Sequence, residues 1–263
     1  MLLVPPFLEH GAQDAWDAET HPLLSLVATY GPWVLGAATL LVILRALVRT
    51  HRYRALRVLG AGAQASVTEA IRAAESKTLG EIVPVVVERS DGHAAARWRC
   101  ALLSLLVGSA LLERYLPWTV PEQLLASQLA LGILGYCLAR LLPDLERMFV
   151  TESFAAETAE EQAVQEFHRY GLRETKSRTG VLIFVSLFER RVVVLGDEGI
   201  HMKAGDDLWK RTRDAILDGV ARNRLAEGLV AGVRACGEVL AVHDPSDGTD
   251  ANEVEDRLIV RAR

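Results

Sequence analysis

An uncharged run near the start of the chain places the strongest constraint on what it can fold into. Residues 23–44 are 22 positions without a charged side chain, enough for a helix to cross the hydrocarbon core of a bilayer. Four acidic residues and no Lys or Arg precede the run, and five arginines follow it between Arg45 and Arg57. Positive flanks stay in the cytoplasm, whereas a cleaved signal peptide carries them ahead of its apolar stretch. We therefore expect a transmembrane anchor.

Two shorter apolar segments, residues 100–112 and 124–139, predict a helical hairpin in the same membrane. Each is short for a full span, but Trp98 and Trp118 lie where interfacial aromatic residues belong. The arginines that flank the pair on one side are Arg97, Arg99, Arg140 and Arg147. We expect the tip of the hairpin to reach the outer face, and the alternative is a re-entrant or interfacial hairpin. Both return the chain to the cytoplasm.

The remainder of the chain predicts a soluble α/β domain. Apolar runs at residues 181–188 and 192–195 flank the charged Glu189-Arg190-Arg191 turn, which indicates a β-hairpin. Neither run alternates between apolar and polar residues, so both faces should be covered by helices. Because two strands make a marginal sheet, residues 82–87 are needed as a third strand, and Pro84 favours an edge position or a bulge there. Residues 257–260 could dock as a further short strand.

Four helices are expected around this sheet, and their starts are predicted from capping patterns. The predicted start signals are the capping boxes Ser66/Glu69 and Thr158/Glu161 and an N-cap at Asp206 or Asp207. The last helix covers residues 224–243. The third strand precedes the membrane hairpin and the other two follow it, so the domain must be assembled from both sides of the hairpin.

The expected organisation has six segments. They are a periplasmic segment at 1–22, a transmembrane helix at 23–48, a first part of the α/β domain at 60–96, a transmembrane hairpin at 97–147, a second part at 148–244, and a flexible tail at 245–263. The expected location is a bacterial inner membrane crossed several times, with the N-terminus in the periplasm and the main domain in the cytoplasm.

These segments carry a family resemblance. The stretches "GEIVPVVVERS", "FHRYGL", "SRTGVLIFVSLFERRVVVLGDEGI" and "GLVAGVRACGEVLAVH" resemble the TPM domain, found in the thylakoid acid phosphatase, in photosystem II repair proteins and in a bacterial membrane-bound subgroup. The resemblance covers residues 60–244 without the hairpin and is most specific from Gly180 to Gly199. It implies a three-layer αβα sandwich around a small mixed sheet and, in some relatives, a divalent metal site with acid phosphatase activity.

Four carboxylates are candidate ligands for a metal ion. Asp197, Glu198, Asp206 and Asp207 follow a strand and lead into a helix, where α/β folds place their sites, and carboxylate oxygens suit Ca²⁺ or Mg²⁺. The alternative is that the first pair forms a turn and the second pair caps a helix. In metal-binding relatives an acidic residue and Asn precede the Gly that opens the strand. Here Arg178 and Thr179 occupy those positions, so we favour no bound cofactor, with Ca²⁺ or Mg²⁺ as the alternative.

Other candidate positions are weaker, and the catalytic residues remain unknown. Glu81 opens the first strand and could face the same cleft, and Arg191 follows the tight turn between the later strands, as in the family pattern. The three cysteines have neither CxxC nor ligand spacing, so a disulfide framework is excluded. The sequence contains no GxSxG, P-loop or HExxH motif, which removes support for the corresponding hydrolases and nucleotide-binding enzymes.

Two functions remain open. The favoured one is a membrane-anchored, non-catalytic interaction module in membrane-protein assembly or quality control, in contact with membrane lipids, a membrane-protein partner and a second copy of itself. The alternative is a metal-dependent acid phosphatase acting on phosphate esters. Nucleic acid is excluded as a partner because the formal net charge is −5 and no basic footprint is present.

Overall fold

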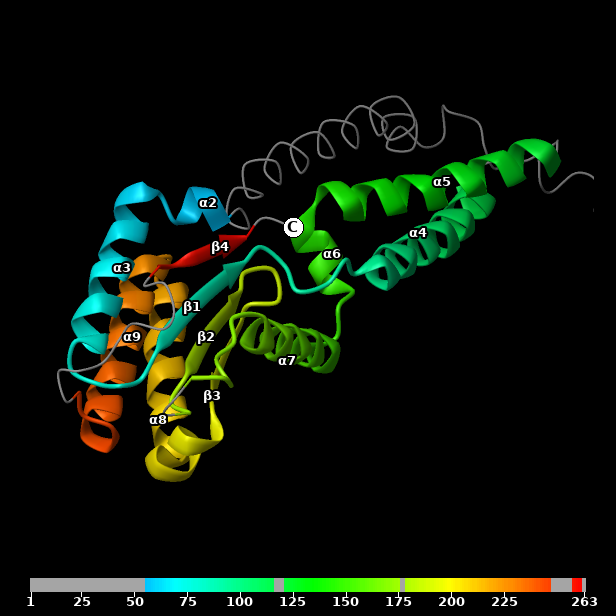
Figure 1. Ribbon diagram of the computed structural model, residues 1–263. Helices are drawn as coiled ribbons and strands as arrows, with labels where there is room; N and C mark the ends of the chain where they lie inside the picture. The colour runs from blue at the N-terminus through cyan, green and yellow to red at the C-terminus, as the bar shows by residue number, and fades with distance from the viewer. Residues whose placement is uncertain (1–54, 116–120, 176–177, 247–256, 262–263) are drawn as a thin grey trace, which may run out of the picture. The chain divides into compact units, whose positions relative to one another are not determined.

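The computed structural model describes residues 55–115, 121–175, 178–246 and 257–261, all within the second of two units, Arg49–Arg263 (Figure 1). The predicted helix at 23–48 and the segment before it lie outside the described residues. The described elements are α2 (Ala55–Val58), α3 (Ala61–Glu75), β1 (Ile82–Val87), α4 (Ala94–Tyr115), α5 (Pro121–Leu141), α6 (Pro143–Met148), α7 (Glu152–Arg169), β2 (Val181–Ser186), β3 (Arg191–Gly196), α8 (Glu198–Ala221), α9 (Leu225–His243) and β4 (Ile259–Arg261).

The four described strands form one mixed sheet in the order β3-β2-β1-β4. β2 and β3 pair antiparallel across a short turn, which confirms the predicted β-hairpin. β1 pairs in parallel with β2 from Ile82↔Val181 to Val87↔Ser186, although α4 to α7 intervene in the sequence. β4, from the tail, pairs in parallel with β1. The fold is therefore α/β, and strands from both sides of the α4–α5 pair build its sheet.

The edge position that Pro84 favours is wrong, because β1 lies between β2 and β4. The carbonyls of Glu81 and Val87 accept hydrogen bonds from the β2 side. Backbone groups alternate in direction along a strand, so Pro84 faces the other side. On that side β4 pairs only with Val85–Val87. Pro84 has no N–H to donate, but it precedes the first residue that pairs with β4, so no hydrogen bond between the two strands is lost.

Helices cover both faces of the sheet. On one face, residues of α3, α8 and α9 form a buried cluster with Ile82, Val86, Val181 and Ile183. On the other face, Ala159, Ala163 and Phe167 of α7 pack against alternate residues of β1 and β2. Every residue of β2 is buried, as the unbroken apolar run predicts. β3 differs from the expectation, because it is an edge strand and most of its residues are only half-buried.

Two helices begin earlier than their predicted capping boxes. α3 starts at Ala61 and α7 at Glu152, so the boxes that begin at Ser66 and Thr158 lie inside these helices. The hydroxyl of Ser66 donates to the carbonyl of Gly62 at 3.1 Å, and that of Thr158 donates to the carbonyl of Phe154 at 2.9 Å. Ser and Thr make this bond to the preceding turn when they sit within a helix, and a capping residue and an interior residue therefore look alike in the sequence.

The start predicted for α8 is also wrong. Its N-cap is Asp197, whose carboxylate accepts a hydrogen bond from the backbone N–H of Glu198 at 2.7 Å. Asp206 and Asp207 lie within the helix, so neither is its N-cap residue. β3 ends at Gly196 and α8 begins at Glu198, so Asp197 is the single residue that joins the strand to the helix.

The tail strand β4 is fixed to α7 by a buried carboxylate. Glu166 is 1 % exposed, and it accepts hydrogen bonds from Arg261 at 2.8 Å and from Gln162 at 2.9 Å. Arg261 also donates to the hydroxyl of Tyr170 at 2.9 Å. A buried carboxylate is costly unless it is paired, so the contact with Arg261 couples β4 to the rest of the sheet.

We expect Arg261→Ala to lower the free energy of unfolding by on the order of 2 kcal/mol, because Glu166 would keep its burial and lose its hydrogen-bonded cation, with only the exposed Arg169 left 4.0 Å away. The measurement is chemical denaturation of the full chain in detergent. Adding Glu166→Gln should recover part of the loss, since the amide carries no charge. The control is Arg173→Ala, an exposed arginine in the loop after α7. A loss no larger than that of the control would contradict this role for Arg261.

Candidate functional site

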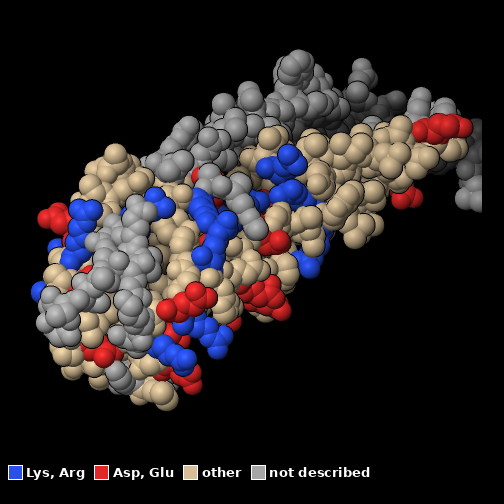
Figure 2. Space-filling view, viewed as in Figure 1, with Lys and Arg blue, Asp and Glu red and all other residues tan. Residues whose placement is uncertain are grey.

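The most unusual surface of the described chain is the pair of helices α4 and α5. Each contains an 18-residue window apolar enough to cross a membrane, Ala94–Leu111 and Leu124–Leu141, and less than a fifth of each window is buried. The large apolar side chains exposed on the pair include Trp98, Leu102, Leu106, Leu125, Leu129 and Ile133. In Figure 2 the flank of the pair is almost entirely uncharged. A core helix of a soluble domain would bury such a face.

Small residues allow α4 and α5 to approach each other closely. A Cβ added to Gly135 would come within 2.5 Å of the Cβ of Ser104, and one added to Gly108 would come within 2.6 Å of Leu131. The hydroxyl of Ser104 donates to the carbonyl of Leu131 at 3.0 Å. Small residues and interhelical hydroxyl bonds are typical of helix packing in membranes. The two helices thus contact each other through small groups and turn their large apolar groups outward.

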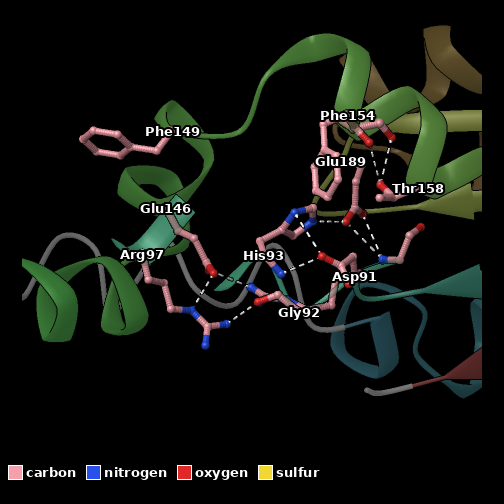
Figure 3. A network of polar contacts seen from close by, with 12 residues as sticks. Asp91, Gly92, His93, Arg97, Glu146, Phe149, Phe154, Thr158 and Glu189 are labelled. Atoms are coloured by element: carbon pink, nitrogen blue, oxygen red, sulfur yellow. Dashed lines mark hydrogen bonds and ion pairs between the residues drawn. The ribbon is translucent and has the colours of Figure 1, made fainter. Parts of the chain in front are cut away.

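A buried carboxylate ties the base of this pair to the strand that precedes it. Glu146 of α6 is 1 % exposed, and its two oxygens accept hydrogen bonds from Arg97 of α4 at 2.8 Å and from Arg89, which follows β1, at 3.0 Å. Arg97 also donates to the carbonyl of Gly92 at 2.6 Å. Figure 3 shows the guanidinium of Arg97 between these two acceptors. The chain leaving β1 and the chain returning from α5 are therefore held together by one carboxylate.

A second buried carboxylate lies beside the first, in the turn between β2 and β3. Glu189 accepts hydrogen bonds from the backbone N–H of Ser90 at 3.1 Å to both oxygens, and from the hydroxyl of Ser186. Its Oε1 lies 2.5 Å from Nε2 of His93. These donors come from the loop after β1 and from the end of β2, so Glu189 joins this loop to the sheet (Figure 3).

His93 is held in place on all sides. Its ring is 1 % exposed, stacks on Phe188 with centroids 4.9 Å apart, and meets Phe154 edge-on at 5.9 Å. The backbone N–H of His93 donates to Asp91 at 2.9 Å, and Nδ1 lies 3.8 Å from the same carboxylate. Its φ of 47° is in the left-handed region, which costs a non-glycine residue energy that the surrounding contacts must supply.

The Ser186, Glu189 and His93 trio contains the residue types of a catalytic triad but not its arrangement. In a triad the histidine stands between the nucleophile and the acid, whereas here the carboxylate stands between the hydroxyl and the imidazole. All three side chains are buried. We therefore interpret the cluster as a structural lock, which we call the base lock and define as Arg89, Ser90, His93, Arg97, Glu146, Ser186 and Glu189.

Hydrogen bonds keep Glu189, the central carboxylate of the base lock, in its charged form. Burial raises the pKa of Glu189, but the hydrogen bonds from His93, Ser186 and the backbone lower it by more, and the net pKa lies below its ordinary value of 4.5. Glu189 is thus a carboxylate at neutral pH. An ionised acceptor makes stronger hydrogen bonds than a neutral one, which suits a residue that must hold a loop against a sheet.

Only some of the candidate site residues proposed from the sequence lie close together in the structure. Around the start of β2, Thr179 donates to the carbonyl of Leu79 at 3.2 Å, the N–H of Asp197 donates to the carbonyl of Gly180 at 2.9 Å, and Arg178 lies 4.0 Å from Glu198. Glu81 is in the same region, since its carbonyl accepts from the first residue of β2. Arg191 lies at the opposite end of the sheet, paired with Glu152.

The four predicted metal ligands are spread along α8. Asp197 caps the helix and Asp206 lies nine residues later, which corresponds to about 14 Å along the axis. The side chains of Asp206 and Asp207 lie outside the described residues. Among the side chains that the structure does describe, no group of three or more His, Cys, Asp or Glu residues is placed to hold a metal ion. The ion pair of Arg178 with Glu198 already partners one of the four. The metal role remains a prediction.

The base lock was not predicted from the sequence. Its acidic members are Glu146 and Glu189, which are distant in sequence from Arg89, Ser90 and His93. The available signals were the polar "ERSDGH" segment directly after a fully apolar strand and a glutamate in a turn between two apolar runs. Neither signal indicates burial, because polar turn residues are ordinarily solvated.

Comparison with known proteins supports the family resemblance over part of the chain. A model of the TPM domain matches residues 146–239, from α6 to α9. Among solved structures, the NMR structure of BA42 protein from the psychrophilic bacterium Bizionia argentinensis is 21 % identical and has a TM-score of 0.48, covering 77 % of this chain and 94 % of that one. No curated protein matches the chain. The matched stretch includes β2, β3 and Glu189, whereas β1 and His93 lie before it.

We expect Glu189→Ala to cost about 3 kcal/mol of unfolding free energy at neutral pH, because it leaves the donors of Ser90, Ser186 and His93 buried without an acceptor. The matched control is Glu174→Ala, an exposed acid, which should cost less than about 0.5 kcal/mol. Since the folded pKa is depressed, the contribution of Glu189 is complete above its unfolded pKa of about 4.5 and is lost as the pH falls through the folded value. The wild type should therefore lose more stability on acidification than Glu189→Ala. Parallel pH profiles would contradict the charged lock.

Proposed function

We propose that this protein anchors a TPM-like α/β domain to a bacterial inner membrane and presents it, on the cytoplasmic side, to a membrane-protein partner. The observation that carries this proposal is the outward apolar face of α4 and α5. Trp98 on α4 and Ile133 on α5 are 66 % and 65 % exposed, a surface that water disfavours and hydrocarbon accepts. Membrane lipids are thus the first partner of the chain.

The lengths of the two helices support a full crossing over a re-entrant hairpin. α4 has 22 residues and α5 has 21, which gives about 33 Å and about 32 Å at the rise of an α-helix. The hydrocarbon core of a bilayer is about 30 Å thick. The charged residues of the pair lie toward its two ends. Arg97, Arg99 and Arg140 lie at the base, and Glu113, Arg114 and Glu122 lie near the far end. The intervening length is uncharged.

The base lock supports a role in presentation. Glu146 and Glu189 connect the helices to the sheet through charge-assisted hydrogen bonds, so the hairpin is joined to the domain by fixed side chains as well as by the chain itself. A domain held in this way keeps one orientation toward the membrane, which suits a module that assembles or surveys membrane proteins. The arginines at the base favour the cytoplasmic side.

The orientation is tested by labelling single cysteines with a membrane-impermeant maleimide in intact cells. After the three native cysteines are replaced by serine, Glu122→Cys at the far end should react from outside, and Glu160→Cys on α7 should react only after lysis. Both residues are exposed, so burial cannot protect either one. Reaction of neither in intact cells would favour the re-entrant hairpin, and reaction of Glu160→Cys from outside would reverse the proposed orientation.

The alternative, a metal-dependent acid phosphatase, is tested with a phosphate ester and with heat. If Asp197 is only an N-cap, the melting temperature should be the same with Ca²⁺ or Mg²⁺ as with a chelator. Hydrolysis of p-nitrophenyl phosphate should then stay at background. Asp197→Asn should change little, because Asn caps a helix as well as Asp does. A metal-dependent rise in melting temperature that Asp197→Asn abolishes, together with hydrolysis, would put the phosphatase first.

A further inference from the structure

We propose that Arg99 and Arg140, at the base of the hairpin, form a binding site for the phosphate groups of anionic phospholipids. The inference rests on the proposed membrane insertion of α4 and α5 and adds the class of lipid that the inserted chain recognises.

An aromatic pair marks the level of the membrane surface on both helices. The rings of Trp98 on α4 and Tyr136 on α5 lie 5.0 Å apart, and Trp98 is largely exposed. Trp and Tyr concentrate at the headgroup level of membranes. From Leu102 on α4 and Ile133 on α5 toward the far end of the two helices, the large exposed side chains are apolar. The headgroups of an enclosing bilayer would therefore lie beside Trp98 and Tyr136.

The two arginines lie on either side of this level, Arg99 about 1.5 Å farther from the α/β domain than Trp98 and Arg140 closer to the domain than Tyr136. Arg99 follows Trp98 directly, and Arg140 is four residues beyond Tyr136 on the same face of α5, about 6 Å closer to the domain. This is the depth of lipid phosphates when the rings occupy the headgroup boundary. Both arginines are exposed.

The acidic side chains at the base are matched by other arginines. Glu146 is paired with Arg89 and Arg97, Asp144 with Arg190, and Glu152 with Arg191 and Arg147. Neither Arg99 nor Arg140 has an ion pair among the residues that the structure describes. Two positive charges at the headgroup level thus have no counterion within the described part of the chain, and a lipid phosphate is the complementary charge at that depth.

The donors of the two side chains are also available. Arg99 uses one N–H of its guanidinium on the carbonyl of Phe149 at 2.8 Å, which fixes the side chain at the base and leaves four of its five N–H groups. Arg140 has no hydrogen bond within the described part of the chain. Guanidinium groups bind phosphate oxygens in a bidentate manner, so each arginine can hold one phosphate.

The test uses the full chain in neutral detergent micelles and measures how its melting temperature depends on added phosphatidylglycerol or on phosphatidylcholine with the same acyl chains. The double variant Arg99→Gln/Arg140→Gln should bind phosphatidylglycerol about 25-fold more weakly than the wild type, since each arginine at an anionic surface contributes about fivefold. The matched control is Arg173→Gln/Arg234→Gln, which removes the same charge from two exposed arginines of the α/β domain and should bind like the wild type.

Each outcome decides between the two proposals. Equal binding of phosphatidylglycerol by the double variant and the wild type, or equal loss in the control, would overturn the phosphate site. Equal stabilisation by phosphatidylcholine would overturn it as well. Equal stabilisation by glycerol phosphate without acyl chains would show a site for free phosphate and would overturn the phospholipid as its ligand. If instead the chain fails to float with phosphatidylcholine vesicles, the membrane insertion itself is wrong. Flotation with loss of the phosphatidylglycerol preference would leave the insertion intact.

Discussion

The parallel pairing of β1 with β2 is the constraint on which the rest of the structure depends. Parallel neighbours cannot be joined by a tight turn, because the chain must return to the end of the sheet from which the first strand began. Here α7 makes that return across one face of the sheet, between Val87 and Val181. The α4–α5 pair is inserted ahead of α7, at the end of β1, so it extends the connection and leaves the ladder between β1 and β2 intact. Lengthening a connection costs little free energy.

Three buried carboxylates hold the segments around this connection together. Glu146 joins the two ends of the insertion, Glu189 joins the loop after β1 to the turn after β2, and Glu166 joins the tail strand to α7. Glu146 and Glu189 each accept hydrogen bonds from at least two partners outside their own element. Glu166 accepts one from Arg261 of β4 and one from Gln162 of its own helix. A buried charge tolerates few alternative arrangements. Apolar clusters on both faces therefore stabilise the fold, whereas these carboxylates fix how its separate segments fit together.

The sequence predicts best those elements, such as the strands, that are determined by residues close together in the chain. The runs around Glu189 predict β2 and β3 because Val, Ile and Phe dominate them, and the apolar run before Arg89 predicts β1. The helix starts at Ser66, Thr158 and Asp206 are wrong, because an interior hydroxyl or carboxylate has the same local pattern as a cap. The base lock could not be predicted, since His93 and Glu189 are 96 residues apart and only the parallel pairing of β1 with β2 brings their loops together.

Spin-label accessibility measures whether α4 and α5 lie in hydrocarbon, as we propose. Nitroxides are placed at Leu106 and Ile133, both exposed on the pair, and at Glu160 on α7 as a water-facing control, in the full chain reconstituted in bilayers. Oxygen concentrates in hydrocarbon and a nickel chelate stays in water. The account predicts that oxygen relaxes the labels at positions 106 and 133 more than the chelate does, with the reverse at position 160. Relaxation by the chelate at 106 and 133 equal to that at 160 would show that these faces meet water, and would contradict the account.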